Sequence, residues 1–187
     1  MKISLTEIMD VSNSNEDVAY QNFWDALWSG NSIQYFDVIS KYVPEFAKLR
    51  GVPQNPKWHP EGDCDIHVCL VIDNLAHLKD KTLSMAAVFH DIGKPYTTKI
   101  NPKTGQPTAP GHEDVSVTFV DKYKDFIESS GADFQSVRDI VANHMRMHQY
   151  NSGDLKNPAK RERMEKSPSF GNLGIFAQAD HDMPLKK

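Results

Sequence analysis

Apolar side chains recur at helical spacing along most of the chain, and no segment shows the strict alternation of a half-buried strand. The predicted helices carry these apolar stripes: Val18, Phe23, Trp24, Leu27 and Trp28; Ile33, Phe36, Ile39 and Val43; Ile66, Leu70, Leu75 and Leu78; Val115, Phe119, Val120, Tyr123 and Ile127; Phe134, Val137, Ile140 and Val141; Leu173, Ile175, Phe176 and Ala179. Aromatic residues that share one stripe belong to a core. We therefore expect an all-α fold, a helical bundle.

Three segments lack this periodicity. The stretch from Gly51 to Asp63 is rich in proline and predicts an ordered or semi-ordered loop. The stretch from Tyr96 to Gly111 is long and polar, and loops of that length often serve as lids or substrate-binding segments. Residues 151–168 are polar and basic, which favours a solvated helix or mobile loop over a phosphate-binding patch.

The stretch from Ser84 to Pro95 carries the strongest chemical signal. It predicts a buried helix that breaks at Gly93 and Pro95, with His90 and Asp91 side by side at the break. Imidazole and carboxylate are ligands that catalytic divalent metals favour. We expect Gly93 to let the backbone turn away without a side chain in the cleft. A lone His–Asp pair also fits a helix C-terminus that carries a favourable histidine.

Further histidines lie where they can reach such a site. His67 is in the first turn of its predicted helix and shares a side with Leu70, which favours an inward direction. His112 follows a glycine at a helix start, from which a side chain can turn into a cleft. His144 lies one turn past an inward isoleucine, whereas His77 is rotated away from His67 and is expected to be structural.

Asp180 and His148 are further candidate site residues. Asp180 follows an apolar stretch, where a carboxylate is costly to bury unless it meets a cation. It is therefore the natural carboxylate to complete a metal site, while His181 and Asp182 compete for that place and are expected to face outward. His148 lies one turn beyond His144 beside a polar stretch and is expected to face solvent or contact substrate.

Composition sets broad limits. A chain of 187 residues with 39% hydrophobic and 25% charged residues fits one ordinary globular domain. The formal charge of −4 argues against a general nucleic-acid coat and leaves room for a local basic cleft. With two cysteines outside any CxxC pair, no signal-peptide pattern and no apolar run of ~20 residues, we expect a cytoplasmic protein without a membrane span. The oligomeric state stays open.

The order of His67, His90-Asp91 and Asp180 on helices resembles the HD superfamily of metal-dependent phosphohydrolases. The segments PKWHPEGD, AAVFHDIGKP and GHED are similar to the HD body of bacterial CCA-adding tRNA nucleotidyltransferases. The likeness implies a single HD domain over 1–187, with N-terminal helices in 1–50 packed on an HD core at 62–182. No Gly-rich strand–turn with paired aspartates precedes the HD part, so tail addition to tRNA is not implied.

The resemblance implies a ligand set and a cofactor. The primary ligands would be His67, His90, Asp91 and Asp180, with His112 and His144 for a second ion. The ions would be one or two divalent transition metals (Mn, Ni, Fe, Co or Zn), with Mg as a further option. The groups expected to orient the ligand histidines are Glu61, Asp63 and Glu113.

One departure bears on the reaction. HD 5′-nucleotidases place a glutamate three residues after the HD aspartate, and here that position is Lys94, which suits phosphate binding and charge neutralisation. We expect Asp91 and Lys94 to act in catalysis and Lys94 and His148 to bind substrate. The implied reaction is attack of metal-activated water on a nucleotide phosphomonoester or 2′,3′-cyclic phosphodiester, with a nucleotide, small phosphoester or RNA end as partner. Alternatives are a nucleoside polyphosphate or dinucleotide hydrolase, and a tRNA- or partner-binding module with a structural metal.

Overall fold

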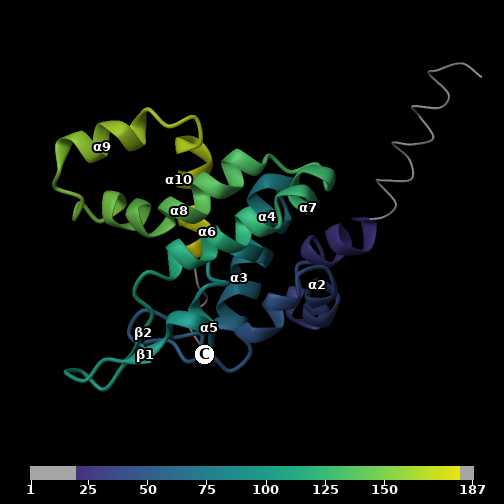
Figure 1. The fold of residues 1–187 in the computed structure, drawn as a ribbon, viewed down its shortest axis with the longest axis horizontal. Helices are drawn as coiled ribbons and strands as arrows, with labels where there is room; N and C mark the ends of the chain where they lie inside the picture. Colours follow the sequence, from purple (N-terminus) through teal and green to yellow (C-terminus); the bar gives the residue numbers. More distant parts are fainter. Residues whose placement is uncertain (1–19, 182–187) are drawn as a thin grey trace, which may run out of the picture.

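The structure is a computed structural model that describes residues 20–181, so the predicted start of the first helix, with Val18, lies outside the described part. Residues 20–27 are helical, and the chain then forms a helical bundle with one small hairpin (Figure 1). The elements follow in this order: 3-10 helix η1 (Ser32–Tyr35), α2 (Phe36–Tyr42), 3-10 helix η2 (Pro44–Leu49), α3 (Cys64–Ala76), α4 (Lys81–Phe89), α5 (Lys94–Thr97), β1 (Lys99–Ile100), β2 (Pro107–Thr108), α6 (His112–Lys122), α7 (Lys124–Ser129), α8 (Phe134–Asn151), α9 (Pro158–Glu165) and α10 (Phe170–His181). The all-α prediction is confirmed.

Helices α4 and α8 form the centre of the bundle. Every residue of α4 from Leu83 to Phe89 is buried, and this helix packs against α3, α6, α8 and α10. A helix with apolar side chains on every face is stable only where all of its faces are buried. The side chain of Asp80 caps it by accepting a hydrogen bond from the Leu83 N–H at 2.9 Å. Because α4 ends at Phe89, it delivers the next two residues, His90 and Asp91, to the middle of the fold.

Three predicted stripes are wrong in part. Ile33, Ile66, Leu78 and Ile175 were expected to face inward but are exposed, with relative accessibilities of 43%, 39%, 41% and 46%. Ile33 lies in the 3-10 helix η1, whose buried residue is Ser32. In α3 nearly every position is apolar, so periodicity could not distinguish its buried face, which carries Val68, Ile72 and Leu75.

The predicted absence of strands is also wrong. Lys99 pairs with Thr108 and Ile100 with Pro107 in an antiparallel hairpin within the polar segment from Tyr96 to Gly111. Strands of two residues are too short to show an alternating pattern. The hairpin projects from the body at the lower left of Figure 1. In residues 20–181 no helix has both the length and the apolar character that a bilayer span requires.

The buried helix breaks as expected, ending at Phe89, and Gly93 is the N-cap of the next helix. It precedes α5, which has Pro95 in its first turn. Its φ of −79° requires no glycine, but a Cβ here would lie 2.3 Å from the His112 carbonyl oxygen and 2.9 Å from the Ser116 nitrogen. The Gly93 N–H instead donates to Ser116 Oγ at 2.9 Å. Glycine therefore lets the start of α6 approach the turn that follows α4.

We predict that Gly93→Ala lowers the free energy of unfolding by about 1–3 kcal/mol, because the methyl group meets backbone atoms that cannot move aside. Gly171→Ala is the matched control, since a Cβ there meets nothing within 4 Å. Urea denaturation of both variants measures the difference. A Gly93→Ala protein as stable as the Gly171→Ala protein would contradict this account of the close approach.

Candidate metal centre

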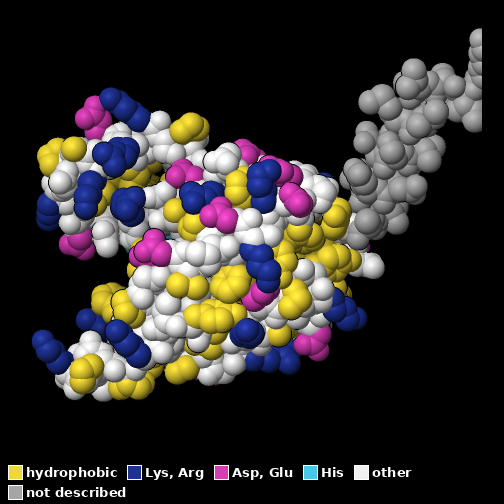
Figure 2. Space-filling model, viewed as in Figure 1, with side chains coloured by type: hydrophobic (Ala, Val, Ile, Leu, Met, Phe, Trp, Pro, Cys, Tyr) yellow, Lys and Arg dark blue, Asp and Glu magenta, His cyan; other side chains and the backbone are white. Residues whose placement is uncertain are grey.

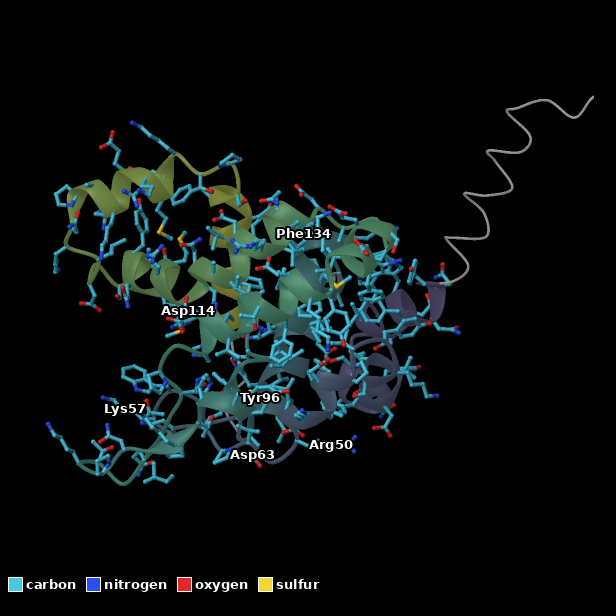
Figure 3. The ribbon with its side chains drawn as sticks, in the orientation of Figure 1. Arg50, Lys57, Asp63, Tyr96, Asp114 and Phe134 are labelled. Carbon is cyan, nitrogen blue, oxygen red and sulfur yellow. The ribbon has the colours of Figure 1, made fainter. Side chains whose placement is uncertain are left out.

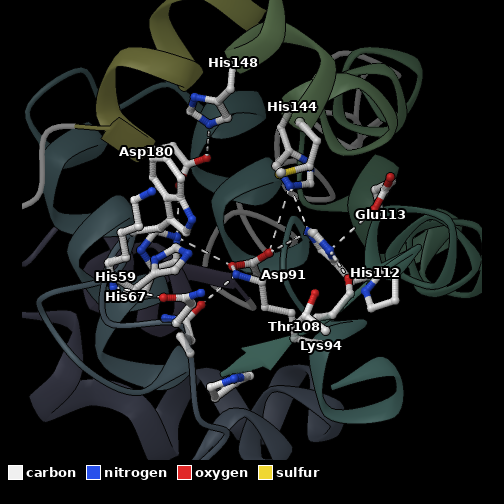
Figure 4. Close-up of a pocket in the computed structure, with 18 of the residues that line it drawn as sticks. His59, His67, Asp91, Lys94, Thr108, His112, Glu113, His144, His148 and Asp180 are labelled. Atoms are coloured by element: carbon white, nitrogen blue, oxygen red, sulfur yellow. Dashed lines mark hydrogen bonds and ion pairs between the residues drawn. The ribbon is translucent and has the colours of Figure 1, made fainter. Parts of the chain in front are cut away.

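Four imidazoles and two carboxylates converge where α3, α4, α6, α8 and α10 meet. Figure 4 labels His67, Asp91, His112, His144 and Asp180 among them. Their side chains are buried, and the most accessible carboxylate, that of Asp180, is 7% exposed. The residues come from five places in the chain: His67 in α3, His90 and Asp91 after α4, His112 at the start of α6, His144 in α8 and Asp180 in α10. The structure thus brings together all six residues predicted to bind metal.

Asp91 lies between two histidine pairs. Its Oδ2 is 3.5 Å from His67 Nε2 and 3.3 Å from His90 Nε2. Its Oδ1 is 3.1 Å from His112 Nε2 and 3.9 Å from His144 Nε2. One carboxylate therefore presents a different oxygen to each pair, which is the arrangement of a ligand that bridges two cations.

Asp180 completes the first pair. Its Oδ1 lies 2.9 Å from His67 Nε2 and 3.8 Å from His90 Nε2. Its Oδ2 lies 2.7 Å from His148 Nε2. His148, predicted to face solvent or substrate, is therefore half-buried and contacts Asp180 while also lining the cleft. His181 is exposed as expected, and Asp182 lies outside the described residues.

The outer nitrogens of the four histidines are all engaged. Each Nδ1 lies within 2.9 Å of an oxygen: His67 with Glu61, His90 with Ala87, His112 with Ala109 and His144 with Val141. Three of these oxygens are backbone carbonyls, which only accept, so the facing Nδ1 donates and the Nε2 lone pair points inward. The Nε2 atoms of His112 and His144 are 3.2 Å apart, and those of His67 and His90 are 3.4 Å apart. Two lone pairs at these distances repel unless a proton or cation lies between them.

The charge of the cluster also calls for a cation. Three carboxylates, those of Glu61, Asp91 and Asp180, belong to the cluster or contact it, whereas Lys94 contributes one ammonium, which is 2.6 Å from Asp91 Oδ2. Apart from this ion pair, neither buried oxygen of Asp91 has a partner in hydrogen-bond geometry among the described residues. Buried polar atoms are normally satisfied. A divalent ion would meet both needs, and the imidazole and carboxylate donors suit Mn, Fe, Co, Ni or Zn.

The titration of these groups reflects the same excess of negative charge. Burial lowers the pKa of His67, but its hydrogen bonds to Asp180 and Glu61 outweigh this effect and raise the pKa to about 9. Burial opposes ionisation of Asp91, yet Lys94 holds the pKa of that carboxyl well below its usual range. Burial lowers the pKa of His144 to about 3. His144 is thus a neutral ligand, whereas His67 carries a proton that a metal would replace.

The HD domain family matches residues 65–181 of the chain. The chain belongs to the HD domain family. Its HD region is similar to two multifunctional CCA proteins. That of Thioalkalivibrio sulfidiphilus (strain HL-EbGR7) is 34% identical over 144 residues, which cover 73% of this chain and 33% of the relative. That of Shewanella frigidimarina (strain NCIMB 400) is 35% identical over 122 residues, covering 58% and 28%.

The chain therefore spans about a third or less of the length of these relatives. No significant match was found among solved structures. The predicted resemblance to an HD body of CCA-adding enzymes is confirmed.

The cluster makes contacts with the proline-rich loop that the sequence pattern missed. His59 Nδ1 lies 2.9 Å from Glu61 Oε1, and the same oxygen is 2.8 Å from His67 Nδ1. Gln54 Oε1 accepts a hydrogen bond from Lys94 Nζ at 2.6 Å. Both His59 and Gln54 lie in the proline-rich loop, where no helical period relates a side chain to the core. The string HPEG, which joins the missed histidine to Glu61, was the available signal.

The other two residues expected to orient histidines behave differently. Asp63 stands at the N-cap of α3, where it is exposed and its side chain makes no capping bond. Glu113 Oε2 lies 3.4 Å from His112 Nδ1. Glu61 thus contacts His67 directly, and Glu113 has a longer contact with His112. The expectation for Asp63 is wrong because its side chain is exposed to solvent.

The candidate metal centre opens into a cleft of about 1370 Å³. Its walls are the proline-rich loop, the hairpin segment and the end of α8, and the hollow appears at the left of Figure 2 between the hairpin and the part that carries α8 and α9. Lys94 lines it together with Asp91. The basic residues of α9 do not, and Lys166 pairs with Glu162 on the surface, which fits a solvated helix.

We predict that metal binding at pH 7 releases about one proton or more per ion, because His67 has a pKa of about 9 and must lose its proton to coordinate. The release should shrink, and the affinity rise, as the pH passes through about 9. Calorimetric titration with Mn²⁺ in buffers of different ionisation enthalpy measures the proton count. His77→Ala, which removes an exposed histidine outside the cluster, is the control. Binding without proton release at pH 7 would contradict the charge assignment.

Proposed function

We propose that this HD domain hydrolyses a nucleotide phosphomonoester or 2′,3′-cyclic phosphodiester with metal-activated water. The observation that carries the proposal is the buried carboxylate of Asp91, which presents one oxygen to His67 and His90 and the other to His112 and His144. Membership of the HD domain family supports the coarser class, a metal-dependent phosphohydrolase.

The residues would divide the work as follows. His67, His90 and Asp180 would hold one ion, His112 and His144 would hold a second, and Asp91 would contribute one oxygen to each. When bound, a divalent ion supplies Lewis acidity and lowers the pKa of coordinated water toward ~7. Glu61 fixes the ring of His67, and His148 fixes the carboxylate of Asp180, so both ligands keep their orientation.

Lys94 would offset the charge that builds on the phosphoryl oxygens. Its ammonium is held between Asp91 Oδ2 and Gln54 Oε1, each at 2.6 Å, and it lines the cleft beside the cluster. Burial lowers its pKa, but the charge of Asp91 outweighs this effect and raises the pKa above the ordinary value, so the ammonium stays charged. A fixed, desolvated cation at this place is typical of electrostatic stabilisation of a transition state.

The relatives support a nucleotide or RNA-end substrate, since both are named multifunctional CCA proteins. We further propose that residues 62–182 form the HD core on which the N-terminal helices of 1–50 pack. Substrate contacts would come from Lys94 and His148, which both line the cleft.

We predict that the protein loaded with Mn²⁺ or Ni²⁺ hydrolyses bis(p-nitrophenyl) phosphate and members of a panel of 2′-, 3′-, 5′- and cyclic nucleotides. Asp91→Ala should reduce kcat by at least about a thousandfold, because both ions lose their shared ligand, while circular dichroism stays helical. His77→Ala should retain activity, since its exposed ring hydrogen-bonds the carbonyl oxygen of Asn74 and lies outside the cluster.

Retention of turnover by Asp91→Ala would refute the assignment. A wild-type protein with neither bound metal nor turnover would favour the tRNA- or partner-binding alternative.

A further inference from the structure

Trp58 is the most exposed large apolar side chain in residues 20–181, with 67% of its surface accessible. The other two tryptophans belong to the core. Trp24 is 3% exposed, and Trp28 packs against the core with its ring stacked on that of Trp24 at a centroid distance of 5.2 Å. Leaving an indole in water forfeits a burial energy of about 2–3 kcal/mol. An exposed tryptophan at the mouth of a cleft therefore points to a ligand that covers it.

The indole is carried by an ordered turn. The carbonyl oxygen of Asn55 accepts hydrogen bonds from the N–H groups of Trp58 at 3.0 Å and His59 at 2.9 Å. The side-chain oxygen of Asn55 accepts from the Lys57 N–H at 3.0 Å. Pro56 and Pro60 restrict the backbone on either side. The backbone that carries Trp58 is therefore held by hydrogen bonds before any ligand arrives.

The same turn is tied to the metal centre. His59, the next residue, shares the Glu61 oxygen with the ligand histidine His67, and the rings of His59 and His67 are 4.6 Å apart. Trp58 lines the cleft in which Asp91 and Lys94 lie. Figure 3 shows Lys57 between the hairpin and the start of α6, at the rim of that opening. If a planar part of a ligand stacked on the indole, the rest of that ligand would lie within the cleft.

We propose that Trp58 is the platform on which the base of the substrate nucleotide stacks while its phosphate lies at Asp91 and Lys94. The inference rests on the proposed function for the place of the phosphate. An indole offers a flat apolar face that any base can cover, and such stacking is tolerant of base identity. Lys57, whose Nζ is 4.6 Å from the ring centroid of Trp58, adds a cation near the nucleotide.

The kinetic test compares two cyclic phosphodiesters, adenosine 2′,3′-cyclic phosphate and the base-free ethylene phosphate. In the metal-loaded protein, Trp58→Ala should lower the ratio of kcat/KM for the nucleotide to that for ethylene phosphate by about 5- to 150-fold, mainly through KM. Trp58→Phe keeps an aromatic face and should restore most of the ratio. Tyr35→Ala, which removes an exposed ring outside the cleft, is the control. An unchanged ratio in Trp58→Ala would overturn the proposal.

A binding test is independent of turnover. Adenosine monophosphate should quench the tryptophan fluorescence of the wild-type protein, and the quenching should disappear in Trp58→Phe although Trp24 and Trp28 remain. A wild-type protein that hydrolyses neither substrate but shows this quenching would refute the proposed reaction and support the stacking platform. Absence of quenching, or equal quenching in the two proteins, would overturn the platform whether or not the protein is a hydrolase.

Discussion

The burial of one carboxylate between two pairs of inward-facing imidazoles is the constraint on which the rest of this structure depends. Asp91 is fully enclosed, and its oxygens have no partner in hydrogen-bond geometry within residues 20–181. Such a charge is tolerated only where cations surround it. Lys94 supplies one unit of positive charge, and the histidines are oriented by their outer nitrogens to bind more.

The fold can be understood as the means of holding that carboxylate. Helix α4 is apolar all round because it must carry His90 and Asp91 into the centre, and Gly93 lacks a side chain so that α6 can bring His112 beside them. Helix α10 closes the cluster from the far end of the described chain with Asp180. Because the clustered residues come from five parts of the chain, a metal bound among them would stabilise the whole bundle.

The sequence predicted the helices, and the residues that the structure brings together at the centre, because both depend on local rules. A histidine on the apolar face of a helix, such as His144, must point into the core, and a carboxylate after an apolar run, such as Asp180, needs a cation. Loop contacts could not be predicted in this way. His59 and Gln54 reach the centre through turns that no period describes. The need for glycine at position 93 arises from α6, which is distant in sequence.

Anomalous diffraction would test most directly whether the cluster binds metal. Crystals grown with Mn²⁺ and measured at the manganese absorption edge should show one or two anomalous peaks, each within coordination distance of an oxygen of Asp91 and among the inward nitrogens of its neighbouring histidines. Diffraction that located the ions elsewhere, or found none between these side chains, would contradict the claim that Asp91 and the imidazoles form a metal centre.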